Sequence, residues 1–294
     1  MSSVEEHRAT RQAAGLFDFS FMGLYELEGT DELQRLQTRD LGRLARGQIA
    51  YTLILAEGGA VRIDATVWRV GEERYWLFAG KRDAYGGRDR SGELAILALQ
   101  GPASGTILAK LVGRDAVRAL RYFHFAQMGP MVVGRIGFSG ELGYELLVPA
   151  EEAPALRARL LDAGRGESLR ECGWAAADSL RIESGYVLFD HEVDGRANPR
   201  ELGLEWLVDG GRTFALTRRL VGLEILGVAE GAQLPAARVT SECLSPTLGK
   251  AIALGFVPPE LVEDSLVSAN GRLARVAALP FHDPGRQRPR APPI

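Results

Sequence analysis

The sequence is poor in lysine, cysteine and histidine, and each shortage excludes a class of function. Nearly all the positive charge is arginine, and the net charge of −3 gives no bulk attraction to nucleic acid or anionic lipid. Cys172 and Cys243 lie far apart and form no CxxC pair, which is typical of a reducing compartment. The scattered histidines form no HExxH pair, so the sequence predicts no metal site.

Long apolar runs and nucleotide-binding glycine motifs are also lacking. No uninterrupted apolar segment approaches the length of a membrane span, and the polar N-terminus has no signal core. The absence of P-loop, GxGxxG and GxSxG motifs argues against nucleotide binding and the α/β-hydrolase fold. We therefore expect a cytoplasmic protein without nucleic-acid or membrane partners.

What is present is the composition of an ordinary globular protein, with 46% hydrophobic and 25% charged residues in a 294-residue chain. This length suits two domains, which we place at 1–206 and 207–294, because short strands and Gly/Pro turns dominate after Trp206. The tail from Asp283 onward is rich in Pro and Arg and is expected to lie extended over the surface. Periodicity predicts strands at 24–27, 51–55, 61–70, 75–79, 94–99, 131–138, 144–148, 220–226, 251–257 and 273–278, and helices at 4–14, 31–36, 102–112, 153–163 and 175–184.

Asp64 is a carboxylate in the middle of a predicted strand, where aspartate is disfavoured. Val61, Ile63, Ala65 and Val67 occupy the other face of that strand. Pattern alone favours an exposed strand face for Asp64. The alternative is a carboxylate in a cleft, where it stabilises a developing cation or handles a proton.

Glu183 lies near the end of a predicted helix, and pattern alone favours a solvated carboxylate. The functional alternative is specific, because a carboxylate accepts two parallel hydrogen bonds from the aminopyrimidine edge of a pterin. The arginine- and aromatic-rich stretch 118–125 resembles a base-stacking segment, but a half-buried strand or loop is the preferred interpretation.

Several short segments together resemble one protein family, the glycine-cleavage T-proteins or aminomethyltransferases. They include GLFDFSFMG at 15–23, LQGP at 99–102, GFSGELGYE at 137–145, ADSLRIESG at 177–185, and further matches at 36–40, 47–52, 239–241, 245–248 and 252–255. Any one of them alone is weak. Their common order across nearly the whole chain makes the resemblance specific.

The resemblance implies an α+β fold, with a folate-binding body of mixed α/β ferredoxin-like units followed by a small C-terminal β-barrel. It also implies a tetrahydrofolate-dependent enzyme that moves a one-carbon unit (methyl, methylene or aminomethyl) between the folate and a donor or acceptor. We expect that donor or acceptor to be a small molecule.

The same resemblance assigns roles to residues of this chain. Glu183 corresponds to the family's helix glutamate and would hold the pterin edge. Asp64 corresponds to the catalytic aspartate and would face N5 and N10, stabilising the positive charge that develops during transfer. The remaining cofactor-binding candidates are Trp76, Phe78 and Leu55 around the apolar ligand surface and Arg218 or Arg219 at the glutamate tail.

Departures from the family pattern leave two alternative functions open. Ile63, Phe78 and Phe21 replace the usual aspartate, asparagine and histidine, and the connections 83–93, 214–220 and 227–239 are short. The chain also begins where the family already has a strand and loop. These differences make a lipoyl carrier protein a doubtful partner. A non-catalytic folate-binding protein and, below it, a glycine-cleavage aminomethyltransferase remain as alternatives.

Overall fold

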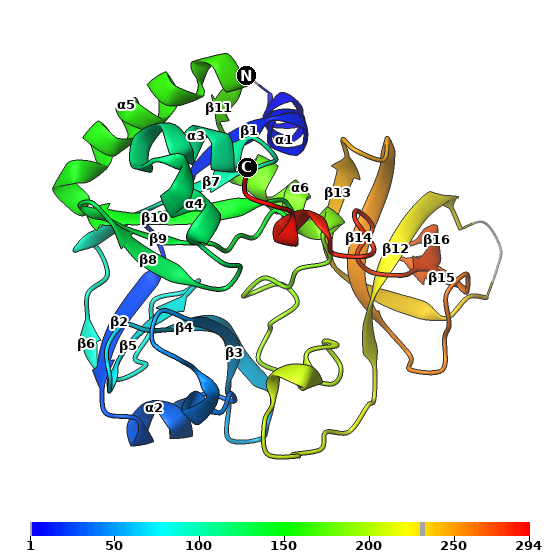
Figure 1. The fold of residues 1–294 in the computed structure, drawn as a ribbon. Helices are drawn as coiled ribbons and strands as arrows, with labels where there is room; N and C mark the ends of the chain where they lie inside the picture. The colour runs from blue at the N-terminus through cyan, green and yellow to red at the C-terminus, as the bar shows by residue number, and fades with distance from the viewer. Residues whose placement is uncertain (1, 230–232) are drawn as a thin grey trace.

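The computed structural model describes residues 2–229 and 233–294, which form two sheets, a barrel and connecting helices (Figure 1). Part of the short segment 227–239, residues 230–232, lies outside the described residues. The helices are α1 (Ser3–Gln12), α2 (Asp31–Leu36), α3 (Ser104–Val112), α4 (Arg114–Ala119), α5 (Ala153–Gly164) and α6 (Trp174–Glu183). Short 3₁₀ helices are η1 (Leu41–Arg43), η2 (Ala150–Glu152), η3 (Arg165–Glu167), η4 (Glu205–Leu207) and η5 (Arg288–Arg290).

A six-stranded sheet forms the upper layer of the body in Figure 1, in the order β11-β1-β7-β10-β9-β8. Its outer face packs against α3, α4 and α5 through residues such as Ile107, Val117 and Leu160. Most of its pairs are antiparallel, and only β11 runs parallel to β1. The strands are β1 (Ala14–Asp18), β7 (Leu94–Gln100), β8 (Phe125–Met128), β9 (Met131–Gly134), β10 (Gly143–Pro149) and β11 (Leu169–Glu171).

A five-stranded antiparallel sheet lies beneath the first, in the order β3-β4-β5-β2-β6. Its outer face packs on α2 and η1 through Leu33 and Leu41. Its inner face shares one apolar core with the inner face of the upper sheet, where Trp68 and Phe78 meet Ala98 and Leu147. The strands are β2 (Gly23–Glu28), β3 (Ile49–Leu55), β4 (Val61–Arg69), β5 (Arg74–Ala79) and β6 (Arg88–Asp89).

The C-terminal strands close into a barrel beside the two sheets, in the order β12-β14-β13-β15-β16. Helix α6 joins the barrel to the body: Leu180 packs in the core between the sheets, and Ile182 packs on Ile252 and Leu254 of the barrel. The barrel strands are β12 (Arg219–Val228), β13 (Ala236–Ser245), β14 (Lys250–Val257), β15 (Leu266–Ala269) and β16 (Arg272–Ala277).

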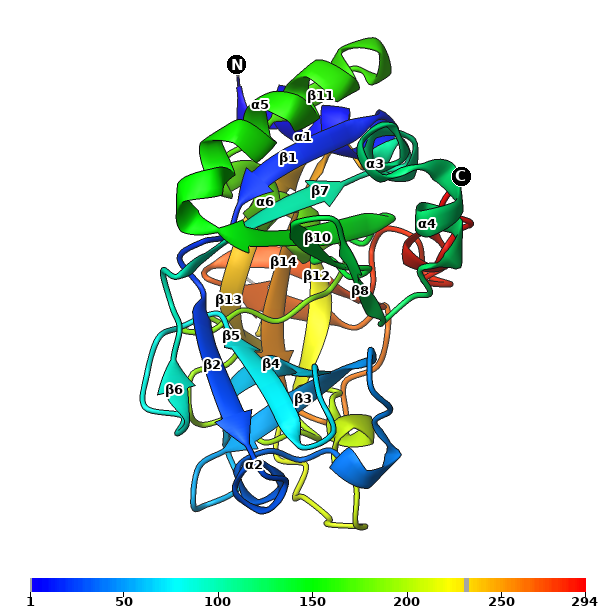
Figure 2. The same ribbon diagram turned by 60° about the vertical axis from the view of Figure 1, so that its left-hand side comes forward.

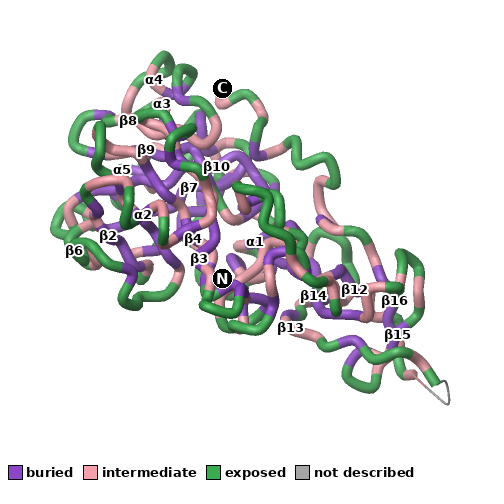
Figure 3. Tube along the Cα trace, turned by 90° about the horizontal axis from the view of Figure 1, so that it is seen from below, coloured by how far each residue is buried: buried purple, intermediate pink, exposed green. Residues whose placement is uncertain are grey.

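The last residues, 282–294, return from the barrel to the upper sheet, and we call this segment the strap. It runs near α6 in Figure 1 and beside α4 in Figure 2. Pro289 is buried, and Ile294 packs on the core of the upper sheet. The tail is therefore not merely extended over the surface, because its proline and terminal isoleucine are apolar and find partners in the body. The rest of the strap is exposed or intermediate, and Figure 3 draws this end of the chain mainly in green and pink.

The predicted fold class, a mixed α/β body with a C-terminal β-barrel, is confirmed. The helix at 31–36 and the strands at 51–55, 61–70, 75–79 and 94–99 correspond to α2, β3, β4, β5 and β7 within one or two residues. The strand expected at 131–138 ends at Gly134, because the following residues turn into a loop that carries Ser139 and Glu141 to a buried ion cluster.

Gly134 sets the spacing of the two sheets at the point where β9 crosses Trp68. A Cβ atom at Gly134 would lie 2.2 Å from the Trp68 ring, which is fully buried and cannot move aside. We expect Gly134→Ala to lower the free energy of unfolding by about 1–3 kcal/mol, the usual cost of overpacking a core. Urea denaturation followed by tryptophan fluorescence measures this change. Gly166→Ala is the matched control because its Cβ would meet nothing within 4 Å, and an equal loss there would contradict the explanation.

Candidate functional site

Asp64 and Tyr51 form a hydrogen-bonded pair on the inner face of the lower sheet. The Tyr51 hydroxyl donates to Asp64 Oδ2 over 2.9 Å, and Asp64 lies on the same face of β4 as Trp68. Burial raises the pKa of Asp64 above its usual value, although the Tyr51 hydrogen bond partly offsets this effect. Burial and the Asp64 charge likewise raise the pKa of Tyr51, so Tyr51 is a neutral hydrogen-bond donor. The exposed strand face favoured by pattern alone is wrong, because Asp64 is half-buried and Tyr51, its hydrogen-bond partner, packs against residues that follow α6, such as Val187.

Two further tyrosines and an arginine of the strap surround this pair. The Arg286 guanidinium lies over the Tyr186 ring, 5.7 Å from its centroid, and Arg290 lies over Tyr122 at 5.9 Å. The positive charge of Arg286 also lowers the pKa of Tyr51, Tyr122 and Tyr186, in each case against a larger rise from burial. Neither arginine forms an ion pair with any described carboxylate. The strap thus places positive charge that no described carboxylate pairs with near Tyr51, Tyr122 and Tyr186.

Glu145 is a second buried carboxylate, on the inner face of the upper sheet. Its strand neighbours are Ala98 on β7 and Gly134 on β9, and Gly134 rests on Trp68 of the lower sheet. The residue is 8% exposed, and within residues 2–229 and 233–294 no hydrogen bond or ion pair reaches its carboxylate. Burial raises the pKa of Glu145 to about 7. Glu145 and Asp64 therefore point into the same layer between the sheets, one from each side.

Glu183 is buried as well, but its oxygens are already bonded to the protein. Arg11 donates from Nε and Nη2 at 3.1 and 2.9 Å, and His7 Nε2 lies 3.1 Å away. Ser245 and Thr247 of the barrel donate to the same carboxylate. Burial alone would raise the pKa of Glu183, but the His7 hydrogen bond and the Arg11 charge outweigh it and lower the pKa to about 2. The solvated helix-end interpretation is wrong, since Glu183 is 0% exposed.

Whether Glu183 touches a pterin stays a prediction, but its geometry favours a structural role. Its oxygens accept from two segments that are far apart in sequence, α1 and the β13–β14 turn. Next to it, Arg11 Nη1 donates to Glu141 Oε1 at 3.0 Å, and Glu141 also pairs with His282 and Arg288 of the strap at 3.1 and 3.3 Å. We call Arg11, Glu141, Glu183 and their partners the ion cluster.

The apolar candidates divide between the core and its edge. Phe78 is 1% exposed and packs 4.9 Å from the Trp68 ring, on the same face as Asp64. Trp76 lies farther along β5, where its indole donates to Glu26 Oε2 at 2.8 Å. Leu55 pairs with Val61 and packs near the barrel junction. Their contact with a ligand stays a prediction.

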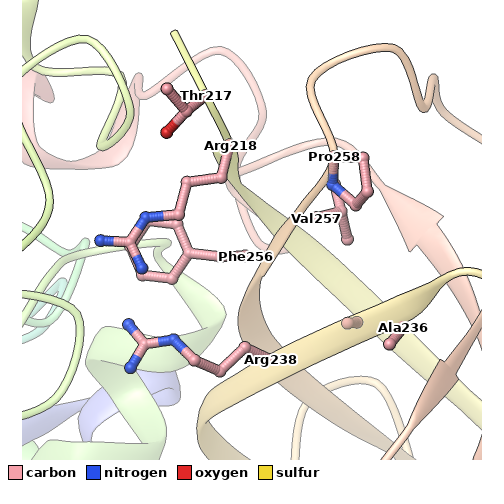
Figure 4. Close-up of a pocket in the computed structure, with 8 residues that line it drawn as sticks. Thr217, Arg218, Ala236, Arg238, Phe256, Val257 and Pro258 are labelled. Carbon is pink, nitrogen blue, oxygen red and sulfur yellow. The ribbon is translucent and has the colours of Figure 1, made fainter.

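Arg218 and Arg219 lie at the start of the barrel and are engaged there. Arg218 stacks over Phe256 at 4.4 Å, together with Arg238 at 5.1 Å (Figure 4). Arg218 also pairs with Glu201 at 3.5 Å. Arg219 donates to the Leu261 carbonyl. Neither arginine is among the groups that act on Asp64 or on its partner Tyr51, whereas the charge of Arg286 acts on Tyr51.

Sequence reasoning missed Glu145, Tyr51 and Arg286. The signal for Glu145 was present: it is the one charged residue in the run 142–148, which otherwise reads as a fully buried strand. Arg286 had no such signal, because nothing in the sequence tells where the strap crosses the body.

Comparison with known proteins decides the family. The family description "GCVT N-terminal domain" matches residues 1–211, and "Glycine cleavage T-protein C-terminal barrel domain" matches residues 218–283. The chain belongs to the glycine-cleavage T-protein family. The resemblance drawn from the motifs is therefore confirmed, as is tetrahydrofolate as the family's cofactor.

Individual relatives agree with this assignment. An aminomethyltransferase of Symbiobacterium thermophilum is 36% identical over 96% of this chain and 89% of its own length. One from Rubrobacter xylanophilus is 35% identical over 97% of this chain and 87% of its own length. The crystal structure of the glycine cleavage system aminomethyltransferase T from Bartonella henselae superposes with a TM-score of 0.81 at 28% identity, covering 95% of this chain and 89% of that one. Within the described residues, no helix combines the length and apolar character needed to cross a membrane.

The ion cluster generates a stability prediction. Since the pKa of Glu183 falls from 4.5 to about 2 on folding, its ionised form stabilises the fold above pH 4.5, and this contribution disappears as the pH falls towards 2. We expect Glu183→Gln to lower the free energy of unfolding at pH 7 by about 3 kcal/mol. Urea denaturation at pH 7, 5 and 3 measures the difference, which should shrink at the lowest pH.

Glu151→Gln is the matched control, because Glu151 is exposed at the start of η2 and forms no described ion pair. It should change the free energy of unfolding by less than about 0.5 kcal/mol. A Glu183→Gln protein as stable as the wild type would contradict the structural role of this carboxylate.

Proposed function

We propose that this protein is a tetrahydrofolate-dependent aminomethyltransferase that binds the folate between its two sheets. The observation that supports this most directly is Glu145, a carboxylate that is 8% exposed and has no described hydrogen-bond partner, on the inner face of the upper sheet. A buried carboxylate without a protein partner is costly unless a ligand satisfies it. The aminomethyltransferase names of the relatives support the choice of the transferred group.

Glu145 fits the pterin better than Glu183 does. An aminopyrimidine edge offers two parallel N–H donors, which match the two oxygens of one carboxylate. The oxygens of Glu145 have no described partner, whereas those of Glu183 accept from Arg11, Ser245 and Thr247. Trp68 of the opposite sheet packs on Gly134, the strand neighbour of Glu145, and so forms part of the apolar surroundings of this carboxylate. We therefore assign the role of pterin anchor to Glu145.

Arg286 fits the other end of the folate. The glutamate moiety carries carboxylates, which a guanidinium binds through two N–H groups. Arg286 is exposed, forms no described ion pair and lies over Tyr186. The Tyr186 ring beneath Arg286 offers a flat surface for the aromatic middle of the ligand.

Asp64 carries the chemistry in this proposal. When bound, tetrahydrofolate supplies the nucleophilic nitrogens N5 and N10 that take over the one-carbon unit. Asp64 places negative charge beside the reacting carbon and stabilises the positive charge that develops there. Tyr51 donates to Oδ2 and so fixes the carboxylate orientation.

The donor of the aminomethyl group distinguishes two forms of the proposal. A small aminomethyl compound fits the short connections of this chain, and an aminomethyl-lipoyl carrier protein is the family's own donor. Ammonia release with each donor, assayed with tetrahydrofolate present, separates them. If the wild-type protein failed to bind tetrahydrofolate, both forms would be wrong. We place the reaction in the cytoplasm, in keeping with the two free cysteines.

Glu145→Gln tests the pterin anchor. We expect the Kd for tetrahydrofolate to rise about 10- to 100-fold, the cost of losing hydrogen bonds to a charged group. Because the pKa of Glu145 is about 7 in the free protein and the pterin N–H groups require the ionised form, wild-type affinity should fall as the pH drops below 7. Binding at pH 7 should also release about half a proton. Isothermal titration calorimetry in two buffers of different ionisation enthalpy measures both effects.

The substitution Glu263→Gln provides the control, because Glu263 is exposed and forms no described ion pair. It should leave both the Kd and the proton release unchanged. If Glu145→Gln kept the wild-type affinity and proton release while Glu183→Gln raised the Kd, Glu183 rather than Glu145 would be the pterin anchor.

Asp64→Asn tests the catalytic assignment. Asparagine keeps the size of the side chain and an acceptor for Tyr51 but removes the negative charge. We expect kcat to fall about 100- to 1000-fold, the usual effect of losing an electrostatic group aimed at the reacting centre. The Kd for tetrahydrofolate should change much less. Stopped-time assays of ammonia release measure kcat, and calorimetry measures the Kd.

Asp115→Asn, on the exposed surface of α4, is the control and should keep wild-type turnover. Wild-type turnover in Asp64→Asn would mean that the carboxylate charge plays no part in the transfer step. A wild-type protein that binds tetrahydrofolate but turns over no donor would favour the non-catalytic folate-binding alternative.

A further inference from the structure

The backbone of Arg286 adopts a conformation that favours glycine over other residues. Its φ angle is 49°, and that of Asp283, three residues earlier, is 53°, so both lie in the left-handed region. A glycine would adopt the same turn without steric cost. A strained conformation of this kind persists only where the surrounding contacts impose it. The strap therefore holds Arg286 in one orientation even though doing so costs some stability.

The turn 283–288 is closed by hydrogen bonds within the strap. The Arg286 N–H donates to the Asp283 carbonyl at 2.8 Å, and the Arg288 N–H donates to Oδ2 of the Asp283 side chain at 2.8 Å. Farther along the strap, Arg290 Nη1 donates to the Arg286 carbonyl at 3.1 Å. The backbone of Arg286 is therefore fixed relative to Arg288, two residues later.

Arg288 joins this turn to the ion cluster. Its Nε lies 3.3 Å from Oε2 of Glu141, whose side chain is 2% exposed. The other oxygen, Oε1, accepts from Arg11 Nη1 at 3.0 Å, and His282 Nε2 lies 3.1 Å from it. Arg288 is the one cation at Oε2 among the described residues. Removing the Arg288 side chain would thus release the turn and leave the other two partners of Glu141 in place.

The Arg286 side chain itself has few contacts. Its guanidinium lies over the Tyr186 ring at 5.7 Å from the centroid, and it has no hydrogen-bond or ion-pair partner among the described residues. Its direction is therefore set by the turn from which it extends and by this stacking. A long side chain that is already oriented loses less conformational entropy when a ligand binds to it.

We propose that Glu141, acting through Arg288, is a positioning residue that directs Arg286 at the glutamate carboxylates of the folate. This inference rests on the proposed function, which places those carboxylates at Arg286. Glu141 and Arg288 touch neither the ligand nor the reacting atoms. They hold the turn in the conformation from which Arg286 reaches over Tyr186, so that the guanidinium is oriented before the folate arrives.

The test compares tetrahydrofolate with 6-methyltetrahydropterin, which keeps the pterin ring but lacks the glutamate. In Arg288→Ala we expect the Kd for tetrahydrofolate to rise about 2- to 10-fold, the effect of having to order one long side chain on binding. The Kd for 6-methyltetrahydropterin should stay at the wild-type value. Arg288→Lys should restore most of the affinity for tetrahydrofolate, because the ion pair with Glu141 is a single contact that an ammonium group can also make. Isothermal titration calorimetry measures each Kd.

A double-mutant cycle separates positioning from a general structural effect. Arg286→Ala should weaken tetrahydrofolate binding by itself, and adding Arg288→Ala to it should cause no further loss, because the side chain to be positioned is gone. Gln287→Ala is the matched control, since Gln287 is exposed in the same turn and its side chain forms no described hydrogen bond. It should leave both Kd values unchanged.

The possible outcomes distinguish the positioning role from the proposed function. An Arg288→Ala protein that binds tetrahydrofolate as tightly as the wild type, or that loses both ligands to the same extent, would overturn the positioning role. Additive effects of Arg286→Ala and Arg288→Ala would do the same. If Arg286→Ala left the Kd for tetrahydrofolate unchanged, the glutamate would bind elsewhere and the positioning role would be wrong. Failure of the wild type to bind tetrahydrofolate would refute the proposed function itself.

Discussion

The fold depends on the placement of one arginine. Arg11 lies between Glu141 and Glu183 and bonds to both, so a single guanidinium is shared by two buried carboxylates. His7 and His282 complete the cluster from opposite ends of the chain. A buried charge left without its partner costs several kcal/mol. The ion cluster is complete only when every contributing element is in place. The stabilities of α1, α6, the barrel and the strap are therefore coupled.

The buried carboxylates Glu183 and Glu145 have opposite environments, one rich in hydrogen-bond donors and one without them. Glu183 is surrounded by donors, and its pKa of about 2 shows that the fold stabilises its charge. Glu145 has no such donors, and its pKa of about 7 shows that the fold disfavours its charge. The first arrangement holds elements together. The second leaves binding energy for a ligand that brings its own donors, which is why the proposed pterin site falls at Glu145.

Periodicity and the ordered motifs predicted most of the architecture, because strands such as β3 and β4 alternate cleanly between two environments. Asp64 could also be identified from the sequence as a candidate site residue, because it is a carboxylate in a strand whose other face is apolar. The role of Glu183 was harder, since sequence does not show that His7 and Thr247 converge on it from 176 and 64 residues away. Arg286 and Tyr51 meet only through tertiary packing. Whether a buried carboxylate is already hydrogen-bonded within the protein depends on partners that are distant in sequence. The local sequence pattern does not show these partners.

The strap has a consequence for how the protein is made. Its His282 and Arg288 contact Glu141, while Arg11, near the start of the chain, contacts the same carboxylate. Domains generally fold in order as they leave the ribosome. Here the first helix cannot reach its final environment until the strap has been synthesised. A nascent chain must therefore carry an incompletely neutralised interior until His282 and Arg288 have emerged and reached Glu141.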